Sequence, residues 1–202
     1  MISAVILAAG ESRRMGKKNK LLLRIGSEAM LVKLVKAVCA SDVAQILVVI
    51  GHEAEQIRLE LNDIPLSFIH NYNFSKGITT SIKSGIKEVS KNSNGMLICL
   101  ADMPYISTSE INKLIHAFVQ NRIKGKKLIV VPVFQGQRGN PVLFSSEFRN
   151  DILDHKKESG CKEVIKNNSE FVMEIAMGND NILLDVDTPE DFQRITKAFE
   201  NK

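Results

Sequence analysis

Short apolar runs alternate with amphipathic stretches along most of this chain. Nearly continuous apolar segments predict strands buried on both faces at residues 5–7, 45–50, 66–70, 96–100 and 128–133. Apolar residues at helical spacing predict helices at residues 30–40, 54–61, 80–89 and 107–122, the last opening on a capping box formed by Ser107 and Glu110. This alternation predicts an α/β fold in which helices cover both faces of a mostly parallel sheet.

The predicted topology indicates where a ligand would bind. Right-handed connections between parallel strands give a doubly wound sheet, and such sheets bind ligands at the carboxyl ends of their strands. The loops at that edge are residues 8–20, 51–53, 71–81 and 101–105. Because no repeat, linker or low-complexity tract interrupts the pattern, we expect a single domain over residues 1–202.

The alternation of apolar strand segments with amphipathic helix segments ends after Pro132. Residues 134–144 predict a turn that feeds a short strand, and residues 171–175 predict a further strand. The last helix is expected to begin with Thr188 as its N-cap and Pro189 at its first position.

Composition narrows the classes of partner. A net charge of +4 over 202 residues, without tryptophan, does not predict nucleic-acid binding but suits a small anionic substrate. Three widely spaced cysteines favour a reducing compartment, the cytoplasm, over a disulfide framework or a zinc site. The first apolar run is short and lacks the basic leader of a signal peptide, and no apolar stretch approaches the ~20 residues of a membrane span.

The first predicted strand runs into a loop suited to phosphate. Ala8, Ala9 and Gly10 keep side chains out of the way so that backbone N–H groups can approach a ligand. Arg13, Arg14 and Lys20 bring positive charge to the same loop. The loop lacks the ending of a Walker A motif and the dinucleotide fingerprint, so neither an ATPase P-loop nor a dinucleotide site is expected.

Acidic residues near strand ends are the candidate metal ligands. Asp102 follows an apolar strand, where a carboxylate can bind Mg²⁺ together with phosphate oxygens, although a lone aspartate can also simply end a strand. Asp185 and Asp187 flank Val186, and residues two apart in an extended segment share a face. Either could supply a second ligand, or one could cap the helix while the other is solvated.

Two polar segments have both a ligand-binding and a structural interpretation. Residues 77–85 place glycine and hydroxyl groups at a helix start, which suits a polar ligand but equally suits helix capping. Residues 136–141 form a polar turn that contains Arg138, which either meets a second substrate or is solvated. The four histidines have no metal-ligand spacing, and none is assigned a catalytic role.

Taken in order, five motifs resemble one enzyme family. They are LAAGESRRMG at 7–16 with Lys20, NYNFSKG at 71–77 with Ser81 and Gly85, LADMP at 100–104, GQRGNPV at 136–142 and DVDTPED at 185–191. Together they resemble the glycosyltransferase-A-like nucleotidyltransferases, and within them the branch of molybdenum cofactor cytidylyltransferases. The match spans nearly the whole chain.

The resemblance implies a fold, a reaction and a set of residues. The fold would be a nucleotide-diphospho-sugar-transferase-like, Rossmann-like three-layer sandwich. The reaction would transfer CMP from CTP to molybdopterin with Mg²⁺ and release pyrophosphate. Its catalytic residues would be Arg14, Lys20 and Asp102, and its metal ligands Asp102 and Asp187. The nucleotide would meet Leu7, Ala8, Ala9, Gly10, Ser12, Arg14, Lys20, Asn71, Gly77 and Ser81. The acceptor would meet Arg138, Gly139, Asn140 and Pro141.

Three positions bear on the substrates. Ala9 stands where the related guanylyltransferases have glycine, and the added methyl group favours the smaller base of CTP. Asn140 replaces a usual histidine, and ESGCK at 158–162 departs from the Gly-Asp-x-Gly-Ala-Arg-like segment of the family, both on the expected acceptor side. These departures leave open a sugar or polyol phosphate acceptor, and a non-catalytic carrier or insertion chaperone for a molybdenum hydroxylase or dehydrogenase. GTP also stays open, because the preference for CTP rests on Ala9 alone.

Overall fold

One mixed but mostly parallel sheet forms the centre of the structure, a computed structural model that describes residues 1–16 and 19–200. Its strands lie in the order β10 (Val172–Ala176), β7 (Ile129–Phe134), β9 (Val142–Ser145), β6 (Gly95–Leu100), β1 (Ile2–Ala8), β4 (Gln45–Ile50) and β5 (Ser67–His70), and β8 (Gln137–Arg138) pairs with β7. Strand β9 runs antiparallel to both of its neighbours, whereas β6, β1, β4 and β5 are parallel. The predicted α/β class and mostly parallel sheet are confirmed.

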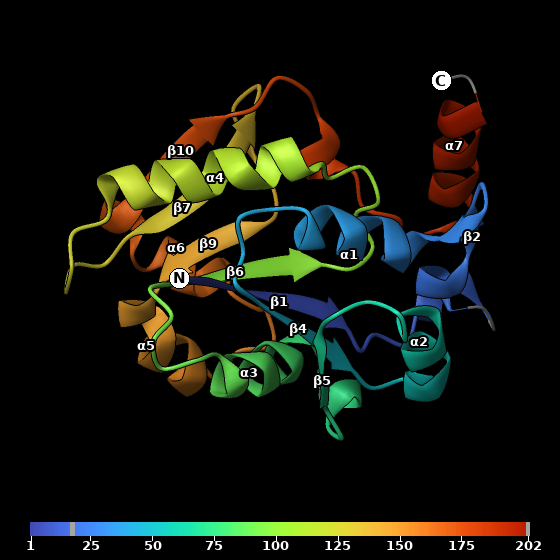
Figure 1. Cartoon of the computed structure of the whole chain (residues 1–202), viewed down its shortest axis with the longest axis horizontal. Coiled ribbons are helices and arrows are strands. Elements are labelled where there is room, and N and C mark those ends of the chain that lie inside the picture. The colour runs from blue at the N-terminus through green and yellow to red at the C-terminus, as the bar shows by residue number, and fades with distance from the viewer. Residues whose placement is uncertain (17–18, 201–202) are drawn as a thin grey trace.

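Helices cover both faces of this sheet, as Figure 1 shows. One face packs against α1 (Met30–Cys39), α2 (Ala54–Glu60) and α4 (Thr108–Asn121), and the other against α3 (Ile78–Glu88), α5 (Arg149–Asp154) and α6 (Lys162–Lys166). Alternate residues of β1 enter the two cores: Ile6 belongs to the first and Val5 to the second. This double burial explains why the central strands are continuous apolar runs.

The order of the strands creates a switch point between β1 and β6. From β1 the chain adds β4 and then β5 on one side, and it adds β6 on the other. Along the strand order, the chain therefore continues from β1 toward β4 and from β6 toward β7, in opposite directions, although α1 and α4 pack on the same face. A doubly wound sheet has its ligand crevice at such a point.

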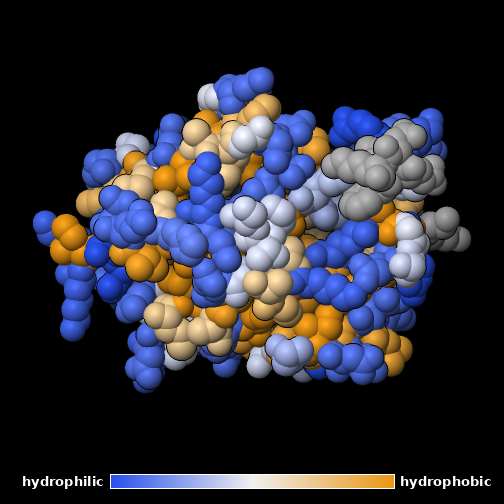
Figure 2. Space-filling view, turned by 45° about the horizontal axis from the view of Figure 1, so that its top comes forward, coloured by the Kyte–Doolittle hydropathy of each residue, from blue (hydrophilic) through white to orange (hydrophobic). Residues whose placement is uncertain are grey.

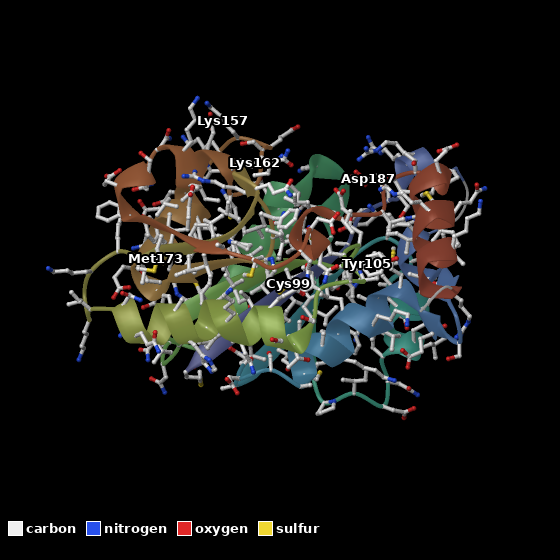
Figure 3. The ribbon with its side chains drawn as sticks, turned by 90° about the horizontal axis from the view of Figure 1, so that it is seen from above. Cys99, Tyr105, Lys157, Lys162, Met173 and Asp187 are labelled. Atoms are coloured by element: carbon white, nitrogen blue, oxygen red, sulfur yellow. The ribbon has the colours of Figure 1, made fainter. Side chains whose placement is uncertain are left out.

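The last helix, α7 (Pro189–Glu200), is anchored near the carboxyl end of β6. Thr188 and Asp191 cap it reciprocally: the Asp191 amide donates to Thr188 Oγ1 at 3.2 Å, and Asp191 Oδ2 accepts from the Thr188 amide at 3.0 Å. The Tyr105 hydroxyl donates to the Ile195 carbonyl at 2.9 Å. Figure 3 shows Tyr105 next to α7 and Asp187 at the start of this helix. The N-cap predicted at Thr188 is thus confirmed.

Several short elements escape the sequence pattern. The two-residue strands β2 (Arg24–Ile25) and β3 (Glu28–Ala29) form a hairpin, and neither α5 nor α6 is predicted. Short 3₁₀ helices include η1 (Arg13–Met15), η2 (Lys20–Leu22), η3 (Phe74–Lys76), η4 (Ser146–Phe148), η5 (Ser169–Phe171) and η6 (Asn181–Leu183). Elements of two to six residues are too brief to show a period.

The surface carries no broad apolar face in the view of Figure 2, where hydrophobic and hydrophilic residues are intermixed. The most exposed large apolar side chains are Leu59, Tyr72 and Val119, which belong to three different segments. Among residues 1–16 and 19–200, no helix combines the length and the apolar character required to cross a bilayer.

Candidate active site

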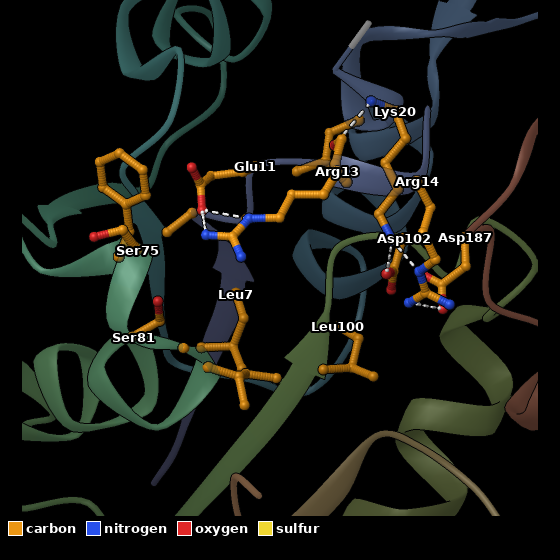
Figure 4. A pocket seen from close by; sticks show the side chains of 17 residues that line it. Leu7, Glu11, Arg13, Arg14, Lys20, Ser75, Ser81, Leu100, Asp102 and Asp187 are labelled. Carbon is orange, nitrogen blue, oxygen red and sulfur yellow. Dashed lines mark hydrogen bonds and ion pairs between the residues drawn. The ribbon is translucent and has the colours of Figure 1, made fainter. Parts of the chain in front are cut away.

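A large cavity opens at the switch point between β1 and β6. Its volume is about 400 Å³. Leu7 of β1 and Leu100 of β6 form its floor, and the side chains around them fall into two groups, as Figure 4 shows. Ser75 and Ser81 lie on one side near the start of α3. Arg14, Lys20, Asp102 and Asp187 lie on the other.

The loop that follows β1 leaves room for a ligand to approach its backbone. A Cβ built on Gly10 would meet no atom within 4 Å, so the space beside this residue is open. Ser12 adopts a left-handed conformation with φ of 52°, and its Oγ accepts a hydrogen bond from the Lys20 amide at 3.1 Å. The loop thus folds back so that Lys20 enters the cavity. This agrees with the open, glycine-containing loop predicted from the sequence.

Two cations and two carboxylates form a network on the charged side. The Lys20 ammonium lies 2.5 Å from Asp102 Oδ2 and 2.7 Å from Asp187 Oδ1. The Arg14 guanidinium lies 2.7 Å from Asp187 Oδ2. The Lys20 and Asp102 side chains are 13% and 18% exposed, whereas that of Arg14 is 67% exposed. The pair between Lys20 and Asp102 is therefore much less screened by solvent than the contact from Arg14.

The network shifts the ionisation of its members. Burial of Lys20 opposes its charge, but the attraction of Asp102 and the hydrogen bonds to both carboxylates outweigh this effect and raise its pKa. Burial also opposes the charge of Asp187, yet its hydrogen bonds and charge contacts with Lys20 and Arg14 lower its pKa. These directions keep the ammonium and the Asp187 carboxylate charged at neutral pH.

One oxygen of Asp102 has no protein partner. Asp102 Oδ1 is buried and makes no hydrogen bond within the described part of the chain. A buried carboxylate oxygen without a partner is costly unless a cation or water meets it. Within residues 1–16 and 19–200, no group of three or more histidine, cysteine, aspartate or glutamate side chains is arranged to hold a metal. Asp102 and Asp187 are nevertheless enough for Mg²⁺, which commonly takes one or two carboxylates and completes its shell with phosphate and water.

The two aspartates before α7 line different cavities. Asp187 lines the large one with Asp102, whereas Asp185 lines a smaller cavity of about 120 Å³. Desolvation by the surrounding chain, together with the negative charges of Asp102 and Asp187, raises the pKa of Asp185. This arrangement favours Asp187 over Asp185 as the partner of Asp102.

The smaller cavity gathers three of the four predicted acceptor residues. Arg138, Gly139 and Asn140 line it, and Leu100 is shared with the large cavity. Pro141 is buried and does not line it. A Cβ on Gly139 would lie 2.2 Å from the Ile182 carbonyl oxygen, so only glycine fits there. Arg138 is half exposed and donates to Glu174 at 2.7 Å.

Two predicted nucleotide residues do not line the large cavity. Ala8 is fully buried in the core beneath it. Asn71 is also buried, and its side-chain amide donates to Thr80 Oγ1 at 2.9 Å and to Ser81 Oγ at 3.0 Å. Asn71 therefore orients the hydroxyl groups at the start of α3, whereas the other expected nucleotide residues Leu7, Ala9, Gly10, Ser12, Gly77 and Ser81 line the cavity.

Several residues that line the large cavity are not predicted from the sequence as part of the site. Glu11, Phe74 and Ser75 line the large cavity, and so does Arg13, which was expected only as a positive charge of the loop and donates to Glu11 at 2.7 Å. All four lie within the two motifs already singled out, so the signal for the segments was present. Apolar periodicity does not predict the backbone conformation of an irregular loop. It therefore does not predict which side chains of the loop point into the cavity.

The segment at 158–162 has a different place from the expected one. Thr79 Oγ1 donates to the Lys157 carbonyl at 2.7 Å and accepts from the Gly160 amide at 3.1 Å. This clamp sets the segment against the start of α3, where the Glu158 side chain lies 3.7 Å from a Cβ built on Gly77. The segment thus lies beside Gly77, which lines the large cavity, while residues 158–162 themselves line neither cavity.

Comparisons with known proteins agree with this geometry. Residues 4–171 match the MobA-like NTP transferase domain. The chain is 28% identical to the purine catabolism protein PucB of Bacillus subtilis, over 96% of both chains. It is 25% identical to the molybdenum cofactor cytidylyltransferase of Escherichia coli, over 95% of this chain and 93% of the other. The crystal structure of an Rv0371c homologue from Mycobacterium sp. strain JC1 superposes with a TM-score of 0.85 at 25% identity, over 99% and 97% of the two chains.

Proposed function

This chain belongs to the MobA-like NTP transferase family and is a nucleotidyltransferase, and we propose that it transfers CMP from CTP to molybdopterin with release of pyrophosphate. One observation supports the proposal most strongly: a single cavity at the switch point combines an open glycine-containing loop, two cationic side chains suited to bind phosphate and two carboxylates. We further propose that residues 1–202 form one domain that carries out this reaction in the cytoplasm, in keeping with three free thiols.

The charged side of the cavity would hold the triphosphate. The Arg14 guanidinium offers a planar fork to phosphate oxygens, and the Lys20 ammonium offers a compact charge. The loop from Leu7 to Gly10 would follow the nucleoside, and the hydroxyl of Ser81 would give it a polar contact on the opposite wall. In this arrangement the protein orients the α-phosphate and neutralises charge, which is the main demand of such a transfer.

The carboxylates of Asp102 and Asp187 would hold Mg²⁺. The buried, unpartnered Oδ1 of Asp102 fits this role, since it lies ready to accept a cation. When bound, the ion would supply positive charge that stabilises the charge developing on the leaving pyrophosphate. Lys20 lies within reach of both carboxylates and can therefore compensate charge as the pyrophosphate departs.

The smaller cavity would receive the acceptor. It adjoins the large cavity through Leu100, so an acceptor phosphate that enters it can face the α-phosphate. Arg138 and Asn140 offer hydrogen-bond donors, and Asp185 offers an acceptor of hydrogen bonds. A pterin with a terminal phosphate carries groups that match both kinds of side chain. The product would pass to a molybdenum hydroxylase or dehydrogenase.

The choice of CTP rests on Ala9. Ala9 lines the large cavity, although it is only 2% exposed and belongs to the apolar core on the α3 face. A methyl group at this position leaves less room for a purine than the glycine of the guanylyltransferases. One methyl group limits discrimination to about 1–3 kcal/mol, so other loop residues must contribute to the selection of the base.

Pyrophosphate release measured over a matrix of substrates tests the proposal. CTP, GTP and ATP are each combined with molybdopterin, a sugar phosphate or a polyol phosphate in the presence of Mg²⁺. We expect the highest kcat/KM for CTP with molybdopterin. Faster turnover with a sugar phosphate or a polyol phosphate would show that this compound, and not molybdopterin, is the acceptor. Nucleotide binding without any turnover would indicate that the protein is a non-catalytic carrier.

A further inference from the structure

The Lys20 ammonium lies between the two carboxylates that we propose as cation ligands. It contacts Asp102 Oδ2 and Asp187 Oδ1, and Arg14 contacts Asp187 Oδ2. Three of the four oxygens of this pair are therefore bonded to side-chain cations of the protein. The fourth, Asp102 Oδ1, is buried beside them. The protein thus neutralises its own carboxylate pair.

The fold fixes Lys20 in this position independently of the ion pairs. Ser12 Oγ accepts from the Lys20 amide at 3.1 Å, and Asn19 Oδ1 accepts from the next amide, that of Leu21, at 3.1 Å. These bonds set the start of η2, and the Lys20 side chain is only 13% exposed. The loop backbone thus holds the Lys20 ammonium between the two carboxylates.

We infer that Lys20 locks the carboxylate pair in the nucleotide-free protein, so that a divalent cation binds there only when a nucleoside triphosphate draws the ammonium away. The inference rests on the proposed function. A cation arriving alone must displace Lys20 from both carboxylates and then remain close to its charge. A triphosphate gives Lys20 and Arg14 new anionic partners and supplies further oxygen ligands.

The lock makes cation and nucleotide binding mutually dependent. Each ligand then raises the affinity for the other by the same factor, as linkage requires. A neutral side chain at position 20 weakens this dependence, because Asp102 is left without a cationic partner and Asp187 keeps only the exposed Arg14. Such a variant should bind a cation without nucleotide, and the bound cation should stabilise it.

Manganese binding in the absence of nucleotide tests the lock. Free Mn²⁺ is measured by electron paramagnetic resonance during titration of the wild type, Lys20→Met and Lys127→Met at pH 7. Lys127 pairs with Asp151 at 2.9 Å, and neither residue lines the large or the smaller cavity, so its variant is a matched loss of a lysine–aspartate pair. We expect Lys20→Met to bind Mn²⁺ at least about tenfold more tightly than the other two proteins, with a rise in Tm on Mn²⁺ addition that they lack.

Each alternative result has a defined meaning. Equal Mn²⁺ affinity of the wild type and Lys20→Met would overturn the lock and leave the proposed function standing. Absence of Mn²⁺ binding by both proteins, even with α,β-methylene-CTP, would overturn the lock and the metal assignment together. Should Lys20→Met fail to fold, Lys20→Gln keeps an N–H donor for one carboxylate, and the same titration and expectation apply to it.

Discussion

At the scale of single residues, the site depends on charges that are placed opposite one another. Lys20 comes from the loop after β1, Asp102 from the end of β6 and Asp187 from the segment before α7. No two of them are near in sequence, yet the switch point brings them within hydrogen-bond distance. A substitution that keeps shape and removes charge should therefore separate chemistry from folding.

Asp102→Asn is the sharpest such substitution. The amide keeps the size of the side chain but cannot offer the negative charge that a divalent cation needs, so we expect kcat for pyrophosphate release to fall at least about 100-fold. The measurement uses saturating Mg²⁺ and CTP, with circular dichroism as the check on folding. Asp42→Asn, at an exposed aspartate paired with His116, serves as the control. If Asp102→Asn were nearly as active as the wild type, Asp102 would not be a metal ligand.

Ala9→Gly tests the choice of base. Loss of the methyl group should raise kcat/KM for GTP relative to CTP by about tenfold or less, because pocket size alone discriminates weakly. Both nucleotides are measured with the same acceptor. Ala8→Gly is the matched control, since Ala8 is buried and does not line the cavity. An unchanged ratio in Ala9→Gly would mean that this side chain does not contact the base.

At the scale of elements, the close approach of α3 to the sheet positions the hydroxyl side of the cavity. A Cβ on Gly85 would lie 2.3 Å from Val5 Cγ1 and 2.9 Å from Val49 Cγ2, so only glycine lets α3 pack this closely on β1 and β4. Gly85 therefore has a structural reason for its place in the motif of residues 71–85, and it lines neither cavity. The start of the same helix carries Ser81 into the cavity.

Gly85→Ala should therefore destabilise the protein by overpacking, by about 1–3 kcal/mol. The free energy of unfolding is measured by chemical denaturation. Gly178→Ala is the control, because a Cβ there meets nothing within 4 Å and its backbone is not left-handed. A Gly85→Ala variant as stable as the control would show that α3 can shift without cost.

The segment before α7 gives a prediction about pH. Because the folded pKa of Asp187 is lowered, its stabilising effect is present above the ordinary value of 3.8 and is lost as pH falls through the folded pKa. Asp187→Asn should lower the free energy of unfolding by roughly 1–2 kcal/mol at pH 7, a value between those of exposed and buried ion pairs. At a pH below the folded pKa of Asp187, the substitution should not change the free energy of unfolding.

Asp185→Asn provides the comparison of opposite sign. The pKa of Asp185 is raised, so its charge opposes folding above that pKa, and the variant should be at least as stable as the wild type at pH 7. Denaturation curves of both variants from pH 7 to pH 3 measure these differences. A loss of stability in Asp185→Asn equal to that in Asp187→Asn would contradict the assignment of the two aspartates to different environments.

The elements differ in how far the sequence predicts them. The runs at Gln45–Ile50 and 96–100 are apolar on both faces and thus mark central strands, and the capping box of Ser107 and Glu110 marks the start of α4. Strand β9 was expected as a short strand, but its antiparallel insertion between β6 and β7 depends on distant pairing that no local pattern encodes. For the same reason, the sequence alone does not predict that Asp185 and Asp187 line different cavities.

At the scale of the whole molecule, the order of strands gathers the motifs into one place. The family motifs are spread from residue 7 to residue 191, yet Leu7, Ser81, Asp102 and Asp187 line one cavity. The parallel arrangement of β1, β4, β5 and β6 puts the loops that follow them at one edge. The central claim is therefore that the nucleotide binds at this edge, between the loop after β1 and the start of α3.

Hydrogen exchange with and without α,β-methylene-CTP and Mg²⁺ tests this claim most directly, because it reports on every segment of the chain at once. The account predicts slower exchange of backbone amides at residues 8–14 and 77–81, with little change along the far edge at β10. Protection confined to β10 or to the amino ends of the strands, with residues 8–14 unaffected, would contradict it.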